Sequence, residues 1–484
     1  MKAAYPIIRS LPFSILIGSL AFLGGCQTYT SQSSDMKSAW QQGKAGVAAA
    51  EVTRKAEESR GKKDELLWRL EQGAVLTAAG NIQGGLDALD KAEEIVNRYE
   101  LEADVKITDS TVSMFTNQAN KPYRGRAYDK IMMNTYKALN HLLLNERDKA
   151  RVELNRAFQR QENAVIENRK RIAEAQEAAE KAKAGELENE EGGQADSYDV
   201  GRAREDPKFS AAADAELARI NERLRPYADY VNPFAVFLDG VFFSHMGFDN
   251  ADIERARKSF ERVNSMSPGN YIQEDFAMAE RMANGKPADK VTYVLFSTGS
   301  APVRDQLRID IPLFLVTNEV SYAGAAFPKL EYRDNFIPEM QILASDGSVH
   351  TTELVADMDA VISKDFKNEW PSIVTKTLIS SAVKAIAGKA VEDEMDGDWT
   401  SMLVAKVANI AYQSATNQAD TRTWTTLPKQ FAYARVPTPA DGSLVLNIGP
   451  HEKSVTVDAG KTNVVMVRSV NSRALPIVNQ FTLQ

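Results

Sequence analysis

The sequence predicts an α+β protein, with an array of α-hairpins in the first half and a β-rich second half that contains a helical segment between its strands. Apolar residues recur at helical spacing from about residue 38 to residue 285, with breaks that contain Gly or Pro. Runs rich in Val, Ile, Leu and Phe begin at residue 291 and return after residue 429, separated by Gly, Pro and Asp turns. Residues 353–415 lie between them and again have helical periodicity.

The composition excludes several classes of protein. A chain of 484 residues, 43% hydrophobic and 26% charged, is long and apolar enough for two or three packed domains. Its single cysteine cannot form an intramolecular disulfide, and its four histidines lie far apart, so neither a metal nor another cofactor is expected. The formal net charge of −8 argues against nucleic acid as a partner, because phosphate recognition needs a basic face.

The amino-terminal segment has the pattern of an export signal. Lys2 and Arg9 make a basic start, and the apolar run 11–23 is too short to cross a membrane comfortably, since a spanning helix needs about 20 residues. Small residues and the only cysteine of the chain follow this run as Leu23, Gly24, Gly25 and Cys26. These four residues resemble the lipobox of bacterial lipoproteins.

The resemblance implies that residues 1–25 are removed as a signal peptide and that Cys26 carries acyl chains. Gln27, which is not aspartate, then directs the protein to the outer membrane, lipid-anchored and facing the periplasm. Several acyl chains on one residue would give stable anchoring. Residues 26–39 are polar and rich in Ser and Thr, as expected of a lipidated tether. The alternative is a lone buried cysteine behind an ordinary signal or anchor helix.

One α-hairpin between Val236 and Pro268 has recurring small and aromatic residues at fixed offsets. They are Gly240, Phe243, Ala256, Phe260, Val263 and Pro268. This resembles the tetratricopeptide repeat, W-x2-L-G-x2-Y…A-x3-F…P. The sequence departs from it in having Val236 and Asp239 where Trp and Leu are usual, and in a longer turn between the helices.

Two further segments carry the same offsets. The first has Gly73, Leu76, Gly85, Leu89 and Ala92, and the second has Ala150, Leu154 and Ala157. Small residues let two helices approach, and the larger ones fill the space between hairpins, so residues 40–285 are predicted to stack as tetratricopeptide-like repeats. A generic helical bundle is the alternative. The resemblance implies a concave surface that recognises another protein.

Residues 160–225 interrupt this array in the sequence. A long polar helix over 160–183 is followed by an acidic, Gly-rich stretch over 185–201 that is predicted to be disordered, and then by another helix. The segment is interpreted as a protruding, solvated insertion; an arm that contacts a partner is the alternative.

The second half is divided into a mixed β/helical domain over residues 291–428 and a small β-sandwich-like module over 429–484. A single sheet system that joins both ranges is the alternative. The stretch 373–391 is rich in small residues and is interpreted as a helix packed tightly on the sheet, rather than as one that faces a membrane or lines a pore.

A short motif, ADTRTWTTLP, covers residues 419–428. Together with residues 299–302 and the helical front, it resembles a family of uncharacterised bacterial outer-envelope lipoproteins, and this resemblance implies architecture and location but no chemistry. The candidate junction residues in it are Asp420, Arg422 and Trp424. We interpret them as a buried clamp between domains, with a ligand site as the alternative.

No catalytic motif is present in the sequence: it has no nucleophile elbow, Walker loop, zinc-protease helix or Rossmann fingerprint. The sequence therefore predicts a non-enzymatic scaffold or adaptor that is anchored to the membrane by lipid and binds another envelope protein through its repeats. Two alternatives stay open. One is a cell-wall factor that binds peptidoglycan or activates a wall synthase, and the other is a hydrolase that uses a pair of carboxylates.

Overall fold

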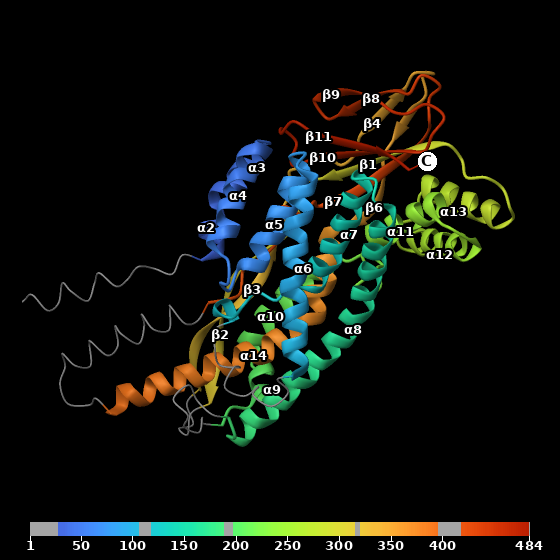
Figure 1. Cartoon of the computed structure of the whole chain (residues 1–484). Helices are drawn as coiled ribbons and strands as arrows, with labels where there is room; N and C mark the ends of the chain where they lie inside the picture. Colours follow the sequence, from blue (N-terminus) through green and yellow to red (C-terminus); the bar gives the residue numbers. More distant parts are fainter. Residues whose placement is uncertain (1–27, 106–117, 188–196, 315–319, 395–417, 484) are drawn as a thin grey trace, which may run out of the picture.

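The computed structural model describes residues 28–105, 118–187, 197–314, 320–394 and 418–483. Helices dominate the first half and β-sheets the second, with the long helix α14 between early and late strands, so the predicted α+β class is confirmed (Figure 1). The helices are α2 (Tyr29–Gln32), α3 (Ser34–Gln41), α4 (Ala45–Glu58), α5 (Glu65–Ala78), α6 (Ile82–Val105), α7 (Ala127–Leu143), α8 (Arg147–Ala184), α9 (Val200–Arg204), α10 (Pro207–Asn221), α11 (Pro233–Met246), α12 (Asn250–Met266), α13 (Asn270–Ala283) and α14 (Met358–Glu394).

The three predicted hairpins are α5–α6, α7–α8 and α11–α12, and they pack in chain order. Their small residues stand where helices touch: a Cβ added to Gly73 would lie 2.4 Å from Leu89, and one added to Gly240 would lie 2.7 Å from the Phe260 ring. Phe243 is buried beneath the guanidinium groups of Arg255 and of Arg151 on α8, so it fills the contact between two hairpins.

The other predicted packing residues lie in the same interfaces. Leu76 is half-buried against the core, and Gly85 lies so close to α5 that an added Cβ would be 3.0 Å from the Gly73 carbonyl oxygen. Pro268 follows the end of α12. The fully buried members are Leu89, Ala92, Ala150, Leu154, Ala157, Ala256, Phe260 and Val263.

Substituting Gly73 with alanine is expected to destabilise the protein, because the new methyl group would meet the branch point of Leu89 at 2.4 Å. Overpacking of this kind costs about 1–3 kcal/mol. Gly46 is the matched control, since it also lies in a helix but has nothing within 4 Å of an added Cβ, and alanine there should add up to about 1 kcal/mol. Equal denaturation midpoints for the two variants would contradict the packing.

The strands form three sheets. They are β1 (Val291–Thr298), β2 (Val303–Phe314), β3 (Val320–Glu331), β4 (Gln341–Ala344), β5 (Val349–Thr351), β6 (Glu353–Asp357), β7 (Gln430–Pro437), β8 (Ser443–Ile448), β9 (His451–Thr456), β10 (Asn463–Ser469) and β11 (Ile477–Thr482). One sheet has the order β11-β10-β1-β7-β6, a second has the order β5-β4-β8-β9, and β2 pairs only with β3. The β1–β10 pair is parallel and the others are antiparallel.

The five-stranded sheet lies between the helices and the four-stranded sheet. On one face, Phe431 stacks on Phe234 of α11 with ring centroids 3.9 Å apart. On the other face, Val294, Leu446 and similar residues of the two sheets share a separate apolar cluster. The two sheets face each other, but each contains strands from both sides of the boundary expected at residues 428 and 429, so residues 429–484 do not form a separate module. This arrangement corresponds to the alternative of one sheet system that joins both ranges. Pairing between distant strands, not local pattern, decides this arrangement.

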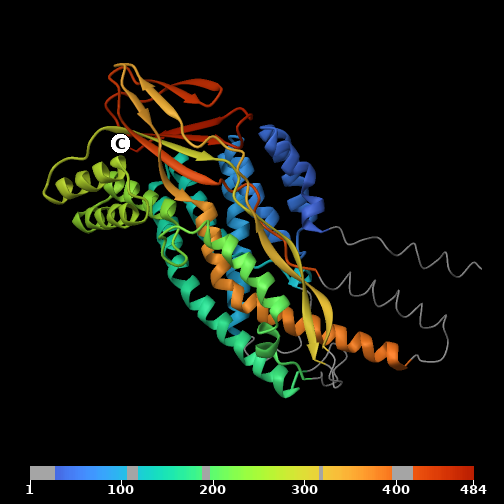
Figure 2. The ribbon, with the colours of Figure 1, turned by 180° about the vertical axis from the view of Figure 1, so that it is seen from behind.

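The expected protruding insertion over 160–225 is not seen in the described residues. Helix α8 continues unbroken to Ala184, where Gly185 adopts a left-handed conformation, and it packs along α14. Its buried face consists of small residues such as Ala175 and Ala178, which permit close approach. Figure 2 shows α8 and α14 from behind, with the β2–β3 hairpin extending beside α14. Residues 188–196 lie outside the described residues.

The predicted tether is also folded from residue 28 onward. Its apolar side chains form a stripe on α2 and α3, and all are buried: Tyr29, Met36, Ala39 and Trp40. The segment is amphipathic although its composition is polar, since the apolar residues Tyr29, Met36 and Trp40 recur at helical spacing. The folded part of the described chain therefore begins at Thr28, which caps α2.

Helix α14 packs against helix α8 and strand β3. Leu378, Ile379 and Ala382 are buried in the main core. The expected helix over 353–415 begins later than predicted, because residues 353–357 are strand β6, and residues 395–417 lie outside the described part. Among the helices described, none is long and apolar enough to span a membrane.

Candidate functional site

The candidate binding site is a groove between α6 and α8, with α7 as its floor. Helix α7 packs against both neighbours, and the groove encloses about 520 Å³. This volume lies within the range of ligand-binding clefts. Its walls are strongly charged: Lys137, Lys149 and Arg156 face five carboxylates, which are Asp90, Glu93, Glu94, Glu146 and Glu153.

The floor of the groove is a buried ionic network around Lys137. The Lys137 Nζ lies 2.9 Å from Asp90 and 3.0 Å from Glu153, and it also pairs with Glu93. Asn134 donates hydrogen bonds to Glu93 (2.9 Å) and Glu153 (2.7 Å). A buried network in which each charge has partners is a rigid surface, so the groove floor is preorganised.

The charges of Glu93 and Lys137 stabilise each other. Burial raises the pKa of Glu93, but the Lys137 ammonium, the Asn134 amide and the Arg156 guanidinium outweigh burial and hold the pKa below its usual value. Burial likewise opposes the charge of Lys137, yet Glu153 and its other carboxylate partners raise the Lys137 pKa. A glycosidase-type general acid needs a raised carboxyl pKa instead. Glu93 is therefore an ionised anchor for the floor.

The rim of the groove is accessible. Glu94 is exposed, and the side chain of Val152 on α8 is 45% exposed. His141 lies at the end of α7, with its Nδ1 2.7 Å from Glu146. An exposed apolar residue beside fixed charges offers both contact area and orientation to an extended, polar segment of a partner.

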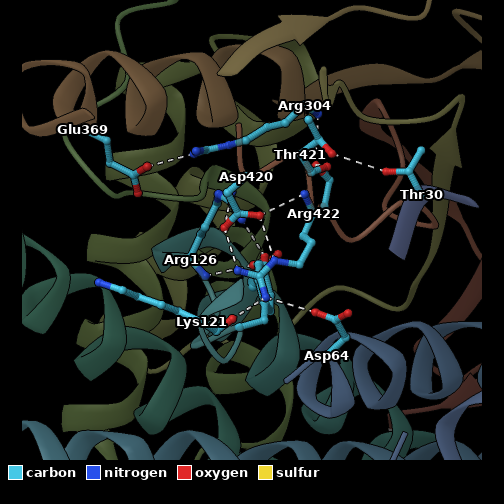
Figure 3. Close-up of polar contacts among 12 residues, drawn as sticks. Thr30, Asp64, Lys121, Arg126, Arg304, Glu369, Asp420, Thr421 and Arg422 are labelled. Carbon is cyan, nitrogen blue, oxygen red and sulfur yellow. Dashed lines mark hydrogen bonds and ion pairs between the residues drawn. The ribbon is translucent and has the colours of Figure 1, made fainter. Parts of the chain in front are cut away.

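The motif over residues 419–428 lies at the junction between the helical half and the β-rich half (Figure 3). Arg422 donates from Nε to Asp420 (2.8 Å) and from Nη1 to Asp64 (3.0 Å) and to the main-chain carbonyl of Lys121 (2.7 Å). Burial alone would raise the pKa of Asp420, but Arg422 outweighs burial and lowers it. The structure thus brings Asp420 and Arg422 together and joins them to loops of the helical half.

A second charged contact extends this junction towards α14. Arg304 on β2 donates to Glu369 on α14 (2.8 Å), and Arg126 lies 4.0 Å from Asp420 (Figure 3). Glu369 is buried, which raises its pKa, but Arg304, Arg171 and Arg126 dominate and lower the pKa to about 2. This layer of alternating charges connects distant parts of the chain.

Sequence reasoning missed the centre of the junction, which is Glu71 on α5. Its buried carboxylate accepts hydrogen bonds from the main chain and hydroxyl of Thr425 (2.6 and 2.7 Å), from those of Thr426 (3.2 and 2.6 Å) and from the Tyr29 hydroxyl (3.0 Å). Trp424 is fully buried beside it and donates to Thr426 (3.0 Å). The available signal was one acidic residue within the apolar run of α5.

The lipobox residues Leu23, Gly24, Gly25 and Cys26 lie outside the described residues. In the part of the chain that is described, no three His, Cys, Asp or Glu side chains gather as metal ligands would. Comparison with known proteins gives no match among family models, curated proteins or solved structures.

Proposed function

We propose that this protein is a lipid-anchored, periplasm-facing adaptor that binds another envelope protein through the groove between α6 and α8. The groove itself carries the proposal: it combines a rigid ionic floor, an accessible rim and a volume that accommodates several side chains. The amino-terminal pattern that ends at Cys26 supports anchoring at the outer membrane. Anchoring confines the groove to a membrane plane and raises its effective concentration for neighbouring proteins.

Photocrosslinking in cells tests this proposal. A photoreactive amino acid replaces Val152 or Glu94, which line the groove. The matched control replaces Ile166, an aliphatic residue on the same helix α8 that is 66% exposed and does not line the groove. The groove positions should crosslink to one envelope protein, and the position of Ile166 should not.

Three results would overturn the proposal. One is no crosslink from either groove position, and another is the same set of crosslinked proteins from Ile166. A third is crosslinking of wall fragments at Val152 in place of a protein, which would support the peptidoglycan-binding alternative. Each crosslink is identified by mass spectrometry of the adduct.

A further inference from the structure

The body of the protein begins within two residues of the proposed lipid. Thr28 caps α2, and Tyr29 is 3% exposed, with its ring centroid 4.9 Å from that of Trp68. Consecutive Cα atoms are about 3.8 Å apart, so the Cα of Cys26 lies within about 7.6 Å of the Cα of Thr28 in any conformation. An acyl group on Cys26 would therefore hold the folded body against the headgroups of the membrane.

Basic side chains gather beside this attachment point. We use the name basic rim for five residues on two loops: Arg60, Lys62, Lys63, Lys121 and Arg124. The loops are joined, because the Tyr123 amide donates to the Lys63 carbonyl (2.7 Å) and the Lys63 ammonium donates to the Ala119 carbonyl (2.9 Å). Figures 1 and 2 show the ends of α4 and α5 that the first loop joins on the same side of the molecule as the start of α2.

Hydrogen bonds connect α2 to the basic rim. The hydroxyls of Thr30 and Thr421 are 3.4 Å apart, and the neighbouring Arg422 bonds to the Lys121 carbonyl and to Asp64. The first residues of the body, the junction motif and the two loops therefore form one connected surface. Figure 3 shows the Lys121 side chain pointing away from Asp64 and Arg422.

The basic rim has no close ion pair within the described part of the chain. Nearby carboxylates pair with other residues: Asp64 with Arg422, Glu57 with Arg69 and Glu58 with Arg54. Among the rim residues, Arg60 lies within electrostatic range of Glu57. Arg60, Lys62, Lys63 and Arg124 are exposed. The surface is therefore basic although the formal net charge of the whole chain is −8.

We propose that the basic rim contacts anionic phospholipid headgroups of the membrane that holds Cys26, and so fixes which face of the body lies on the membrane. The inference rests on the proposed lipid anchor and adds an orientation to it. Lys121 supports it: burial, with Lys376 and Arg124 nearby, lowers its pKa to about 8. A lipid phosphate beside the Lys121 ammonium would favour its charged form and raise the pKa again. A fixed orientation would present the groove at a constant height above the membrane.

Headgroup quenching on vesicles tests the orientation. Acylated full-length protein is reconstituted in vesicles that contain phosphatidylglycerol and a quencher attached to lipid headgroups. A fluorescent thiol label is placed at Pro122→Cys within the basic rim or at Ser265→Cys on the distant helix α12; both positions are exposed. Cys26 is the only natural cysteine and its thiol would carry the diacylglycerol, so each variant has one reactive thiol.

The label at position 122 should be quenched and the label at position 265 should not. The triple variant Arg60→Gln, Lys62→Gln, Arg124→Gln should lower the ratio of docked to undocked protein on the order of a hundred-fold, as should vesicles of phosphatidylcholine alone. The matched control neutralises three distant exposed cations and should change nothing; they are Lys258, Lys286 and Lys453.

Equal quenching at both positions would overturn the proposal, as would quenching at position 122 that is unaffected by lipid charge and by the triple variant. Loss of an acidic protein from the crosslinked partners of the triple variant, with vesicle docking unchanged, would assign the basic rim to a protein instead. A mature protein without acyl mass at Cys26 would refute the proposed function itself, and mass spectrometry separates that outcome from the others.

Discussion

Replacing Glu71 with glutamine should destabilise the protein by about 3 kcal/mol or more, because one carboxylate oxygen that accepts hydrogen bonds becomes an amide group that faces buried donors. Both oxygens are engaged in the wild type, mainly by Thr425 and Thr426. The loss is measured as a lower denaturation midpoint. Faster amide exchange over residues 419–428 should accompany it, since this segment is fastened to α5 through Glu71.

Glu94→Gln is the matched control, because Glu94 is exposed on α6 and its substitution should change stability by no more than about 0.5 kcal/mol. If both glutamine variants unfold at the wild-type midpoint, the buried carboxylate does not hold the two halves together. Equal exchange rates over residues 419–428 would lead to the same conclusion.

Arg422→Met should cost about 3–5 kcal/mol, since removal of one partner leaves buried charges uncompensated. Asp420 and Asp64 would lose their hydrogen-bonded counterion, and the Lys121 carbonyl would lose its donor. Arg422→Lys should be intermediate, because lysine keeps the charge but lacks the planar fork that reaches several acceptors.

The control for Arg422 is Arg473→Met, at an exposed position where little change is expected. This comparison also separates the two interpretations of the motif. A clamp predicts a loss of stability in Arg422→Met, whereas a ligand site predicts wild-type stability together with the loss of a bound molecule. If Arg422→Met unfolds at the denaturation midpoint of the wild type, the interpretation as a clamp is wrong.

Hairpin packing could be predicted from the sequence because it depends on local spacing. Gly73 and Leu89 lie on adjacent helices of one hairpin, and the offset that places them in contact is visible in the chain. The same holds for Gly240 and Phe260. Small residues at these offsets indicate where two helices approach, whatever the rest of the fold does.

The sheets and the charged sites could not be predicted in this way. Strand β1 pairs in parallel with β10, about 170 residues later, and no local pattern encodes that partner. Glu71 and Thr425 are separated by 354 positions, and Lys137 meets both Glu93 and Glu153 only when three helices have packed. Such contacts depend on tertiary structure. From a single sequence, the only sign of a buried acidic residue is that it interrupts an apolar run.

Polar composition also misled the interpretation of two segments. The stretch after Cys26 contains many Ser and Thr residues, yet Tyr29, Met36 and Trp40 form a buried stripe. Helix α8 is rich in Glu and Lys, yet its alanines pack against α14. In both cases a narrow apolar face is sufficient for burial when the neighbouring surface is close.

The mass of the mature amino terminus is the most direct test of the anchored adaptor. Protein purified from the membrane fraction should yield a first peptide that begins at Cys26 and carries fatty-acyl mass, and Cys26→Ser should accumulate as an uncut, unacylated precursor. A wild-type first peptide that starts elsewhere, or that starts at Cys26 without acyl mass, would contradict the anchor on which the proposed function and the membrane orientation both depend.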